Sequence, residues 1–306
     1  MATTLTPNPL KPELWSIIPQ EGLAFLGAQT GISDPEELKR HAISVQEEAY
    51  LVHPYPCICR FSFLQLNLSR LPAYAKLLAI GKERKNPIFL DIGCCFGNDI
   101  RKAVADGFPM EGVIGSDLHS EYWDLGHKLF KTTSETFPVA FLPGDAFDPT
   151  HLEAAPPIPT ASDAATAPFS LPLWTAGLTS LNPLRARAAA IHASSFFHLF
   201  DEAQQLHVAR ALAGLLDPAP GSVILGSHVG RAEKGLRTEV RRANSHGRTM
   251  FCHSPESWAA LWDGEVFPKG VVEVEATLHE VVREDYELHA APETKFWLLV
   301  WSVTRV

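Results

Sequence analysis

One continuous stretch carries the strongest structural signal in the chain: Pro87-Ile-Phe-Leu-Asp91-Ile-Gly93-Cys94-Cys95-Phe96-Gly97-Asn98-Asp99-Ile100. The apolar run from Ile88 to Leu90 is typical of a buried parallel strand, and Asp91 stands at its carboxyl end. A turn with two glycines follows, and a helical pattern then runs from Asn98 to Ala105. This order of strand, glycine turn and helix predicts the first unit of an α/β fold whose ligands bind at the strand ends.

The two glycines of the turn, Gly93 and Gly97, suit a sharp bend where a Cβ would collide with a bound group. The helix behind them presents unpaired N–H groups and the positive end of its dipole, which favour a carboxylate or phosphate. Cys95 stands where the dinucleotide motif G-x-G-x-x-G has its second glycine, and no Lys-Ser/Thr pair makes the turn a P-loop. The form Asp-x-Gly-x-x-x-Gly resembles motif I of class I S-adenosylmethionine (SAM) methyltransferases, with the middle glycine replaced.

Composition narrows the class of protein. The 306 residues are 46% hydrophobic and 20% charged, which is ordinary for a globular protein with a large core. The formal net charge of −9 argues against binding nucleic acid along a basic face. We expect no membrane contact, because no apolar run approaches the ~20 residues of a membrane helix and the first residues lack signal-peptide features. The five cysteines lack zinc-site spacing, so we expect reduced thiols, no metal and a cytoplasmic protein.

The first part of the chain, residues 1–86, is predicted to form a helical cap without strands. Ser33-Asp34-Pro35-Glu36 has the pattern of a helix start, and this helix should run to about Leu51. The segment from His53 to Arg60 contains two prolines and predicts a rigid, irregular link. Large apolar residues between Phe61 and Leu71 indicate a buried helix, and a shorter helix is expected from Ala73 to Ile80.

From residue 87 onward, apolar runs alternate with helical patterns, and residues 87–306 are predicted to form a seven-stranded mixed sheet. Four further parallel strands are expected at Val113–Leu118, Val139–Leu142, Ala190–Phe197 and Ser222–Ser227. Two long β segments at the C-terminus, 271–279 and 295–304, have no helix between them and should pair antiparallel. Five parallel strands followed by an antiparallel pair are typical of the Rossmann-like sandwich of class I methyltransferases.

Two stretches lie outside this alternation. Residues 151–180 form an insertion rich in Ala and Pro, and its apolar second half should fold over the body as a lid. Residues 228–262 contain several arginines and histidines and two tryptophans, and we expect them on the substrate side.

Acidic residues follow three successive predicted strands. The carboxyl ends of parallel strands meet at one edge of a sheet, so Asp91, Asp117 and Asp145 should lie close together. Asp117 comes one βαβ step after Asp91, the distance expected for a carboxylate that accepts both ribose hydroxyls. Asp145 is placed to accept an adenine amino N–H, with Ala146 and Phe147 against the ring. These positions predict a nucleoside ligand.

A family resemblance points to the same ligand. Several segments are similar to fungal secondary-metabolite methyltransferases of the austinol-pathway type: 89–101 with Asp106-Gly107 and Gly115-Ser-Asp117-Leu118, Ile191 to Phe200 with Gln204 and Gln205, and His253-Ser-Pro-Glu-Ser-Trp258. The similarity covers about residues 50–301, and Gly-Cys-Cys-Phe-Gly is its most specific part. It implies SAM-dependent O-methylation of a small product, in the type member a carboxyl group of a meroterpenoid. The 151–180 insertion departs from the compact pattern of that family and leaves the substrate open.

The candidate site combines three groups of residues. The candidate cofactor contacts come from the turn, the strand ends and the cap: Asp91, Gly93, Cys94, Cys95, Asp117, Leu118, Asp145, Ala146, Phe147, Ser194, Ser195, Tyr50 and Arg60. For the two cap residues, Tyr50 and Arg60, a role in the core or on the surface is the alternative. The candidate catalytic residues are histidines near the strand ends: His198, His228 and His253. The candidate substrate contacts are Trp174, His246, Met250, Phe251 and Trp258.

Some of these residues also have an ordinary structural explanation. Cys94 and Cys95 suit a tight turn better than the role of a nucleophile. His192, within the fourth predicted strand, is expected to be a hydrogen-bonded core histidine. His198 either contacts the ligand or only caps the following helix, and Trp258 has the spacing of a core residue.

We predict a SAM-dependent O-methyltransferase that releases S-adenosylhomocysteine (SAH) and methylates a small molecule, with a carboxyl group of a terpenoid or polyketide-terpenoid as acceptor. One alternative is a phenolic O- or N-methyltransferase on the same fold. Another is a SAM-binding protein or cyclase that transfers no methyl group. A nicotinamide dehydrogenase is disfavoured by Cys95 and by the C-terminal antiparallel pair. The oligomeric state is left open.

Overall fold

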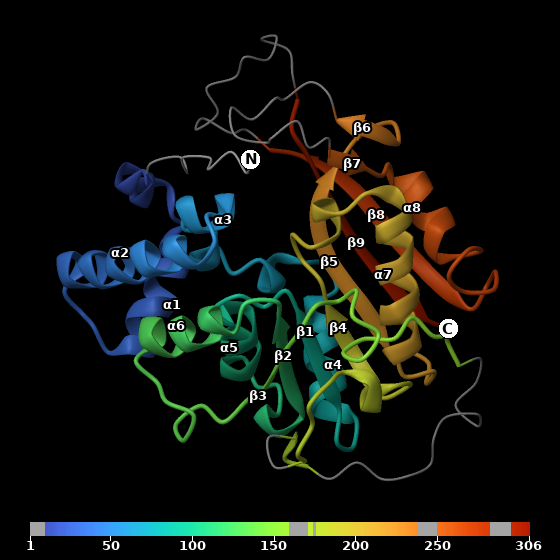
Figure 1. Ribbon diagram of the computed structural model, residues 1–306, viewed down its shortest axis with the longest axis horizontal. Helices are drawn as coiled ribbons and strands as arrows, with labels where there is room; N and C mark the ends of the chain where they lie inside the picture. The colour runs from blue at the N-terminus through green and yellow to red at the C-terminus, as the bar shows by residue number, and fades with distance from the viewer. Residues whose placement is uncertain (1–9, 159–170, 174–175, 238–249, 282–294) are drawn as a thin grey trace, which may run out of the picture.

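The computed structural model describes residues 10–158, 171–173, 176–237, 250–281 and 295–306 (Figure 1). Its central sheet has the strand order β3-β2-β1-β4-β5-β9-β8. These strands are β1 (Ile88–Ile92), β2 (Val113–Asp117), β3 (Ala140–Pro143), β4 (Ala188–His192), β5 (Val223–Gly230), β8 (Val272–Glu280) and β9 (Trp297–Arg305). The first five pair in parallel, and β9 runs antiparallel to both β5 and β8. The predicted class I methyltransferase sheet, with its antiparallel C-terminal pair, is confirmed.

Helices cover both faces of this sheet because its central strands are apolar on both sides. In β1, Ile88, Leu90 and Ile92 belong to the core formed with α7 (Glu202–Leu215) and α8 (Pro255–Trp262). Phe89 belongs to the core on the other face, formed with α4 (Tyr74–Glu83) and α5 (Asn98–Ala105). Burial on both faces explains why these strands appear in the sequence as continuous apolar runs.

The N-terminal segment packs as a helical cap against α6 (Ser120–Phe130). It contains a 3-10 turn, η1 (Pro12–Ile17), followed by α1 (Gln20–Thr30), α2 (Pro35–Val52) and α3 (Pro56–Cys59). Leu26 and Ala42 of the cap share a core with Leu129 and Phe130 of α6. In Figure 1 the cap lies on the opposite side of the molecule from β8. Residues 10–86 contain no strand, as predicted.

The prediction of a helix over residues 61–71 is wrong, although the predicted burial of this segment is confirmed. The segment forms two 3-10 turns instead, η2 (Ser62–Leu64) and η3 (Leu68–Arg70). Phe61 and Leu66 adopt positive φ angles of 54° and 50°, which no α-helix accommodates. Apolar composition therefore predicted burial correctly, but these two residues break the helical path.

Two other boundaries differ from the predictions. The fourth strand ends at His192 rather than at Phe197, because Ser195 has a φ of 55° and turns the chain into η8 (Phe197–Leu199). Helix α2 begins as predicted after Asp34, whose side chain accepts a hydrogen bond from the Glu37 N–H at 2.7 Å. Helix α1 was not predicted, because its apolar residues do not gather on one face.

The insertion after β3 is anchored to the body by apolar side chains. Leu152 and Leu173 are buried in the core on the α7 side, and Leu171 and Leu178 pack against it. Residues 159–170 and 174–175, including Trp174, lie outside the described residues. No helix in the described part of the chain is long and apolar enough to cross a membrane.

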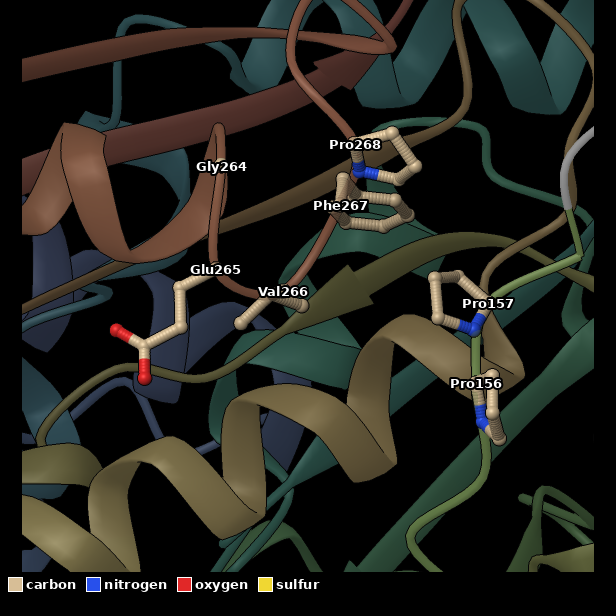
Figure 2. A pocket seen from close by; sticks show the side chains of 7 residues that line it. All are labelled: Pro156, Pro157, Gly264, Glu265, Val266, Phe267 and Pro268. Atoms are coloured by element: carbon tan, nitrogen blue, oxygen red, sulfur yellow. The ribbon is translucent and has the colours of Figure 1, made fainter.

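A pocket near this insertion is lined by Pro156, Pro157 and residues 264–268 (Figure 2). Arg305, the last residue of β9, lies beside it: the guanidinium is 5.4 Å from the Phe267 ring and donates to the Ile158 carbonyl. The end of β9 pairs with the start of β5. The pocket therefore lies at the opposite end of the sheet from the predicted strand-end acids.

Candidate active site

The turn after β1 is fastened to the end of β2. The N–H groups of Gly93 and Cys94 both donate to the Ser116 carbonyl, at 2.8 and 3.1 Å. Gly93, Cys95 and Gly97 all have positive φ angles, of 72°, 51° and 68°. The chain therefore bends through the left-handed region three times before α5 begins, which explains why two of these positions are glycine.

Asp117 stands at the end of β2, directly beside this turn. Its Oδ2 accepts a hydrogen bond from the Cys95 N–H at 2.9 Å, and its Oδ1 accepts one from the His119 N–H at 3.0 Å. Burial raises the pKa of the Asp117 carboxyl, although these two backbone donors work in the opposite direction. An ionised carboxylate has about four acceptor positions, so Asp117 is oriented by the backbone and can still accept from a ligand. The neighbouring Leu118 side chain is exposed.

Asp145 follows β3 and lies at the same edge of the sheet. The Gly144 N–H donates to the Asp117 carbonyl at 3.0 Å, which joins the two strand ends. Asp145 Oδ1 accepts a hydrogen bond from the Phe147 N–H at 2.9 Å. Ala146 is buried, and the Phe147 ring packs edge to face against Phe200 at 4.9 Å. The structure thus brings the second and third predicted acids together.

Asp91, the first predicted acid, is buried inside a hydrogen-bonded chain of side chains. Its Oδ1 lies 2.8 Å from His192 Nδ1, and His192 Nε2 lies 2.7 Å from the Ser194 hydroxyl. Burial alone would lower the pKa of the His192 imidazole, but the Asp91 carboxylate raises it above its ordinary value. His192 is therefore the hydrogen-bonded core histidine that was predicted. Ser195 is exposed, and its N–H donates to the Ser227 carbonyl.

Asp99, in the first turn of α5, is a second buried carboxyl near Asp91 and His192. Its Oδ1 accepts a hydrogen bond from the Leu68 N–H at 3.0 Å. Burial raises its pKa from 3.8 to about 6, with His192 acting in the opposite direction and Asp91 adding to the rise. The folded protein therefore holds this proton more tightly than the unfolded chain does, and the stability from Asp99 is lost as pH rises through about 6.

We expect Asp99→Asn to stabilise the fold in a pH-dependent way. The amide oxygen can still accept from Leu68, but no charge has to be buried. At pH 8 the free energy of unfolding should rise by about 1–3 kcal/mol, because one pKa unit corresponds to about 1.4 kcal/mol. The gain should shrink to near zero at about pH 4. Urea unfolding of both proteins across this range measures the difference, and an equal gain at both pH values would contradict the buried charge.

The cap contributes a further residue near this edge, beyond the two that were predicted. Tyr50 lies on α2, where burial and Cys59 raise its pKa, and Arg60 follows α3. Tyr55, which the sequence analysis missed, lies near the turn, since burial and then the Asp117 carboxylate raise the pKa of its phenol to about 12. The two prolines around Tyr55 were the available signal, because they indicate a rigidly held residue.

The three predicted catalytic histidines come together on the other side of the strand ends. His228, on β5, is buried. Burial lowers the pKa of its imidazole, and its neighbours His198 and His253 lower it further. Its Nδ1 lies 3.0 Å from the Trp301 indole nitrogen. His253 follows β7 (Met250–Cys252), and its Nδ1 lies 2.9 Å from the Ser257 hydroxyl. His198 lies in η8 at the end of β4.

The predicted substrate contacts are placed only in part. Trp258 is fully buried on α8, with its ring 4.9 Å from Phe197 and 4.7 Å from His228. Met250 and Phe251 lie on β7, which pairs with β6 (Gly235–Arg237). His246 lies outside the described residues. No group of three or more metal-ligating side chains was found among the residues with described positions.

Comparison with known proteins shows which family the chain belongs to. The sequence profile of a meroterpenoid methyltransferase N-terminal domain matches residues 10–64. O-methyltransferase phiE, from a fungal species, is 31% identical over 252 residues, which are 82% of this chain and 73% of the relative. The chain belongs to this family of fungal methyltransferases. The predicted resemblance is therefore confirmed, and the chain is an enzyme of the methyltransferase class.

Two further relatives are methyltransferases from Aspergillus and Penicillium species. The asnovolin E/chermesin D methyltransferase nvfJ of Aspergillus novofumigatus is 32% identical over 74% of this chain and 69% of its own length. Methyltransferase ausD of Penicillium brasilianum is 29% identical over 74% of this chain and 70% of its own length. The methyltransferase thus has fungal relatives, one of which is named for asnovolin E and chermesin D.

Proposed function

We propose that this methyltransferase uses SAM to methylate a carboxyl group of a small terpenoid or polyketide-terpenoid. The choice of a carboxyl group as acceptor rests on His228 and His253, because the tautomer of the first and the low pKa of the second make them poorly suited to remove a proton. The proposal that SAM is the cofactor rests on the glycine turn and on the two acids beside it.

The residues at the strand ends fit a nucleoside cofactor. The Asp117 carboxylate, fixed by two backbone N–H groups, is suited to accept hydrogen bonds from both ribose hydroxyls. Leu118 and Ala146 offer apolar surface for an adenine ring, and Asp145 offers an acceptor for its amino group. SAM supplies an activated methyl group, so the protein has mainly to align and desolvate the acceptor.

His228 is held in one tautomer that cannot act as a base. An indole N–H is only a donor, so the 3.0 Å contact with Trp301 makes His228 Nδ1 the acceptor. Burial, together with His198 and His253, lowers the pKa of His228 well below its ordinary value, so the ring is neutral and its proton lies on Nε2. The buried Nε2 makes no hydrogen bond within the described structure. His228 can therefore donate to an acceptor oxygen but cannot take its proton.

His253 is also a weak base. Burial, followed by the positive charge of Lys234, lowers its pKa to about 4. A phenol, with a pKa around 10, needs a base whose own pKa is closer to the working pH. A carboxylic acid, with a pKa around 4, is already ionised and needs no base. The pair His228 and His253 therefore favours a carboxylate acceptor over a phenol.

We expect the turnover rate to be flat from about pH 6 to 9. Neither the carboxylate acceptor nor His253 titrates in this window, since both lose their protons near pH 4. His198→Gln should keep a sizeable part of the activity, because the amide still orients the acceptor. The measurement is turnover at saturating SAM and acceptor. A rate that falls as pH drops through about 6.5, together with loss of most turnover in His198→Gln, would replace the carboxyl proposal with a phenolic one.

A further inference from the structure

The segment 53–57 of the N-terminal cap reaches the cofactor edge of the sheet. Tyr55 lies close enough to Asp117 for the charge of that carboxylate to raise the pKa of the phenol. Its ring is 6.0 Å from the His119 ring and 6.1 Å from the Tyr122 ring. His119 in turn donates its backbone N–H to Asp117. A cap residue far away in sequence is thus placed beside the carboxylate at the end of β2.

The backbone around Tyr55 is restricted by its neighbours. Tyr55 lies between Pro54 and Pro56, has φ −65° and ψ 143°, and donates its N–H to the His53 carbonyl at 2.8 Å. The Tyr122 hydroxyl donates to the same carbonyl at 2.8 Å, which ties the segment to α6. The His53 ring packs against the Tyr55 ring at 4.1 Å. A ligand would therefore meet a ring that is already in place, and little entropy would be lost in ordering it.

The Tyr55 hydroxyl is an available hydrogen-bond donor. Burial first, and then the charge of Asp117, raises its pKa to about 12, so the phenol keeps its proton at neutral pH. Among the described residues this hydroxyl makes no hydrogen bond, in contrast to the hydroxyls of Tyr74 and Tyr122. A half-buried ring near a carboxylate, with an unused donor, matches the chemistry of a ribose hydroxyl.

We propose that Tyr55 is a cofactor-positioning residue, whose ring closes the ribose side of the SAM site and whose hydroxyl donates to a ribose oxygen. This inference rests on the proposed use of SAM. It gives the N-terminal domain a direct part in cofactor binding, because the segment that carries Tyr55 belongs to that domain. Tyr55 and Asp117 then approach the ribose from the cap and from the sheet.

Calorimetric titration with SAH tests this role without a methyl acceptor. Tyr55→Phe, which loses only the hydroxyl, should bind SAH about fivefold more weakly. Tyr55→Ala, which also loses the ring, should bind at least twentyfold more weakly. Leu51→Ala serves as a control, because the Leu51 side chain is 87% exposed on the cap. The affinity of this variant for SAH should stay within twofold of that of the wild-type protein. Thermal unfolding without ligand shows whether each variant is folded.

A second probe locates the effect along the cofactor. 5′-Methylthioadenosine lacks the amino-acid part of SAH, so the loss caused by Tyr55→Phe should be the same for both ligands. SAH affinity within twofold of wild type in folded Tyr55→Ala would overturn the inference, as would a loss seen with SAH alone. Failure of the wild-type protein to bind SAH would instead refute the proposed cofactor, so the two failures are distinguishable.

Discussion

Gly93→Val should abolish SAM binding. Gly93 has a φ of 72°, a conformation that costs a residue with a side chain about 1–2 kcal/mol and a β-branched residue more. A Cβ at this position would lie 2.9 Å from Cδ2 of Phe196, so the first residue of the turn and the segment after β4 would have to separate. The proposed site places the methionine end of the cofactor at this turn, where valine would fill the space. We expect SAH affinity to fall more than a hundredfold.

Gly31→Val is a matched control for the backbone strain. Gly31 has a nearly identical φ of 71°, lies in the cap after α1, and has no atom within 4 Å of an added Cβ. Both variants should lose stability from the left-handed conformation, but only Gly93→Val should lose SAH affinity. A crystal structure of Gly93→Val with SAH bound in the normal position would refute this placement of the turn.

Asp117 should carry a large part of the SAM affinity. A carboxylate that accepts from two ribose hydroxyls makes charge-assisted hydrogen bonds, each worth about 1.5–3 kcal/mol. We expect Asp117→Ala to weaken SAM binding at least tenfold. Asp117→Asn separates the charge from the geometry, because its amide oxygen can still accept from one of the two backbone donors, Cys95 or His119.

The measurement is calorimetric titration of each folded variant with SAM. Asn should bind more tightly than Ala but remain weaker than wild type. Unchanged affinity in a folded Asp117→Ala protein would remove Asp117 from the site and with it the ribose end of the proposed pocket.

Local sequence pattern predicted the sheet and the acids at its edge well. Ile88 to Leu90 and the other apolar runs predict strands without knowledge of their partners, and Asp117 and Asp145 follow directly from where those strands end. The pattern failed where single residues adopt unusual backbone angles, as Phe61 and Ser195 do. Nothing in their neighbours indicates a positive φ.

The chemistry of individual side chains depended on contacts that the sequence does not reveal. His228 Nδ1 accepts a hydrogen bond from Trp301, which is 73 residues away along the chain. Asp91 is engaged by His192, at a separation of 101 residues. Tyr55 lies beside His119 and Tyr122 only because the cap packs on α6. Each of these contacts is set by tertiary packing, so residue type and spacing could suggest candidates but not their protonation state or partners.

Transfer of a labelled methyl group tests the central claim most directly. The enzyme would be incubated with SAM carrying a trideuterated methyl group and with pairs of terpenoid substrates that offer either a carboxylic acid or a phenol on the same skeleton. The account predicts that the label appears on the acid as a methyl ester, which mild alkali converts back to the acid. A labelled product that survives alkali, formed only from the phenol, would contradict carboxyl O-methylation.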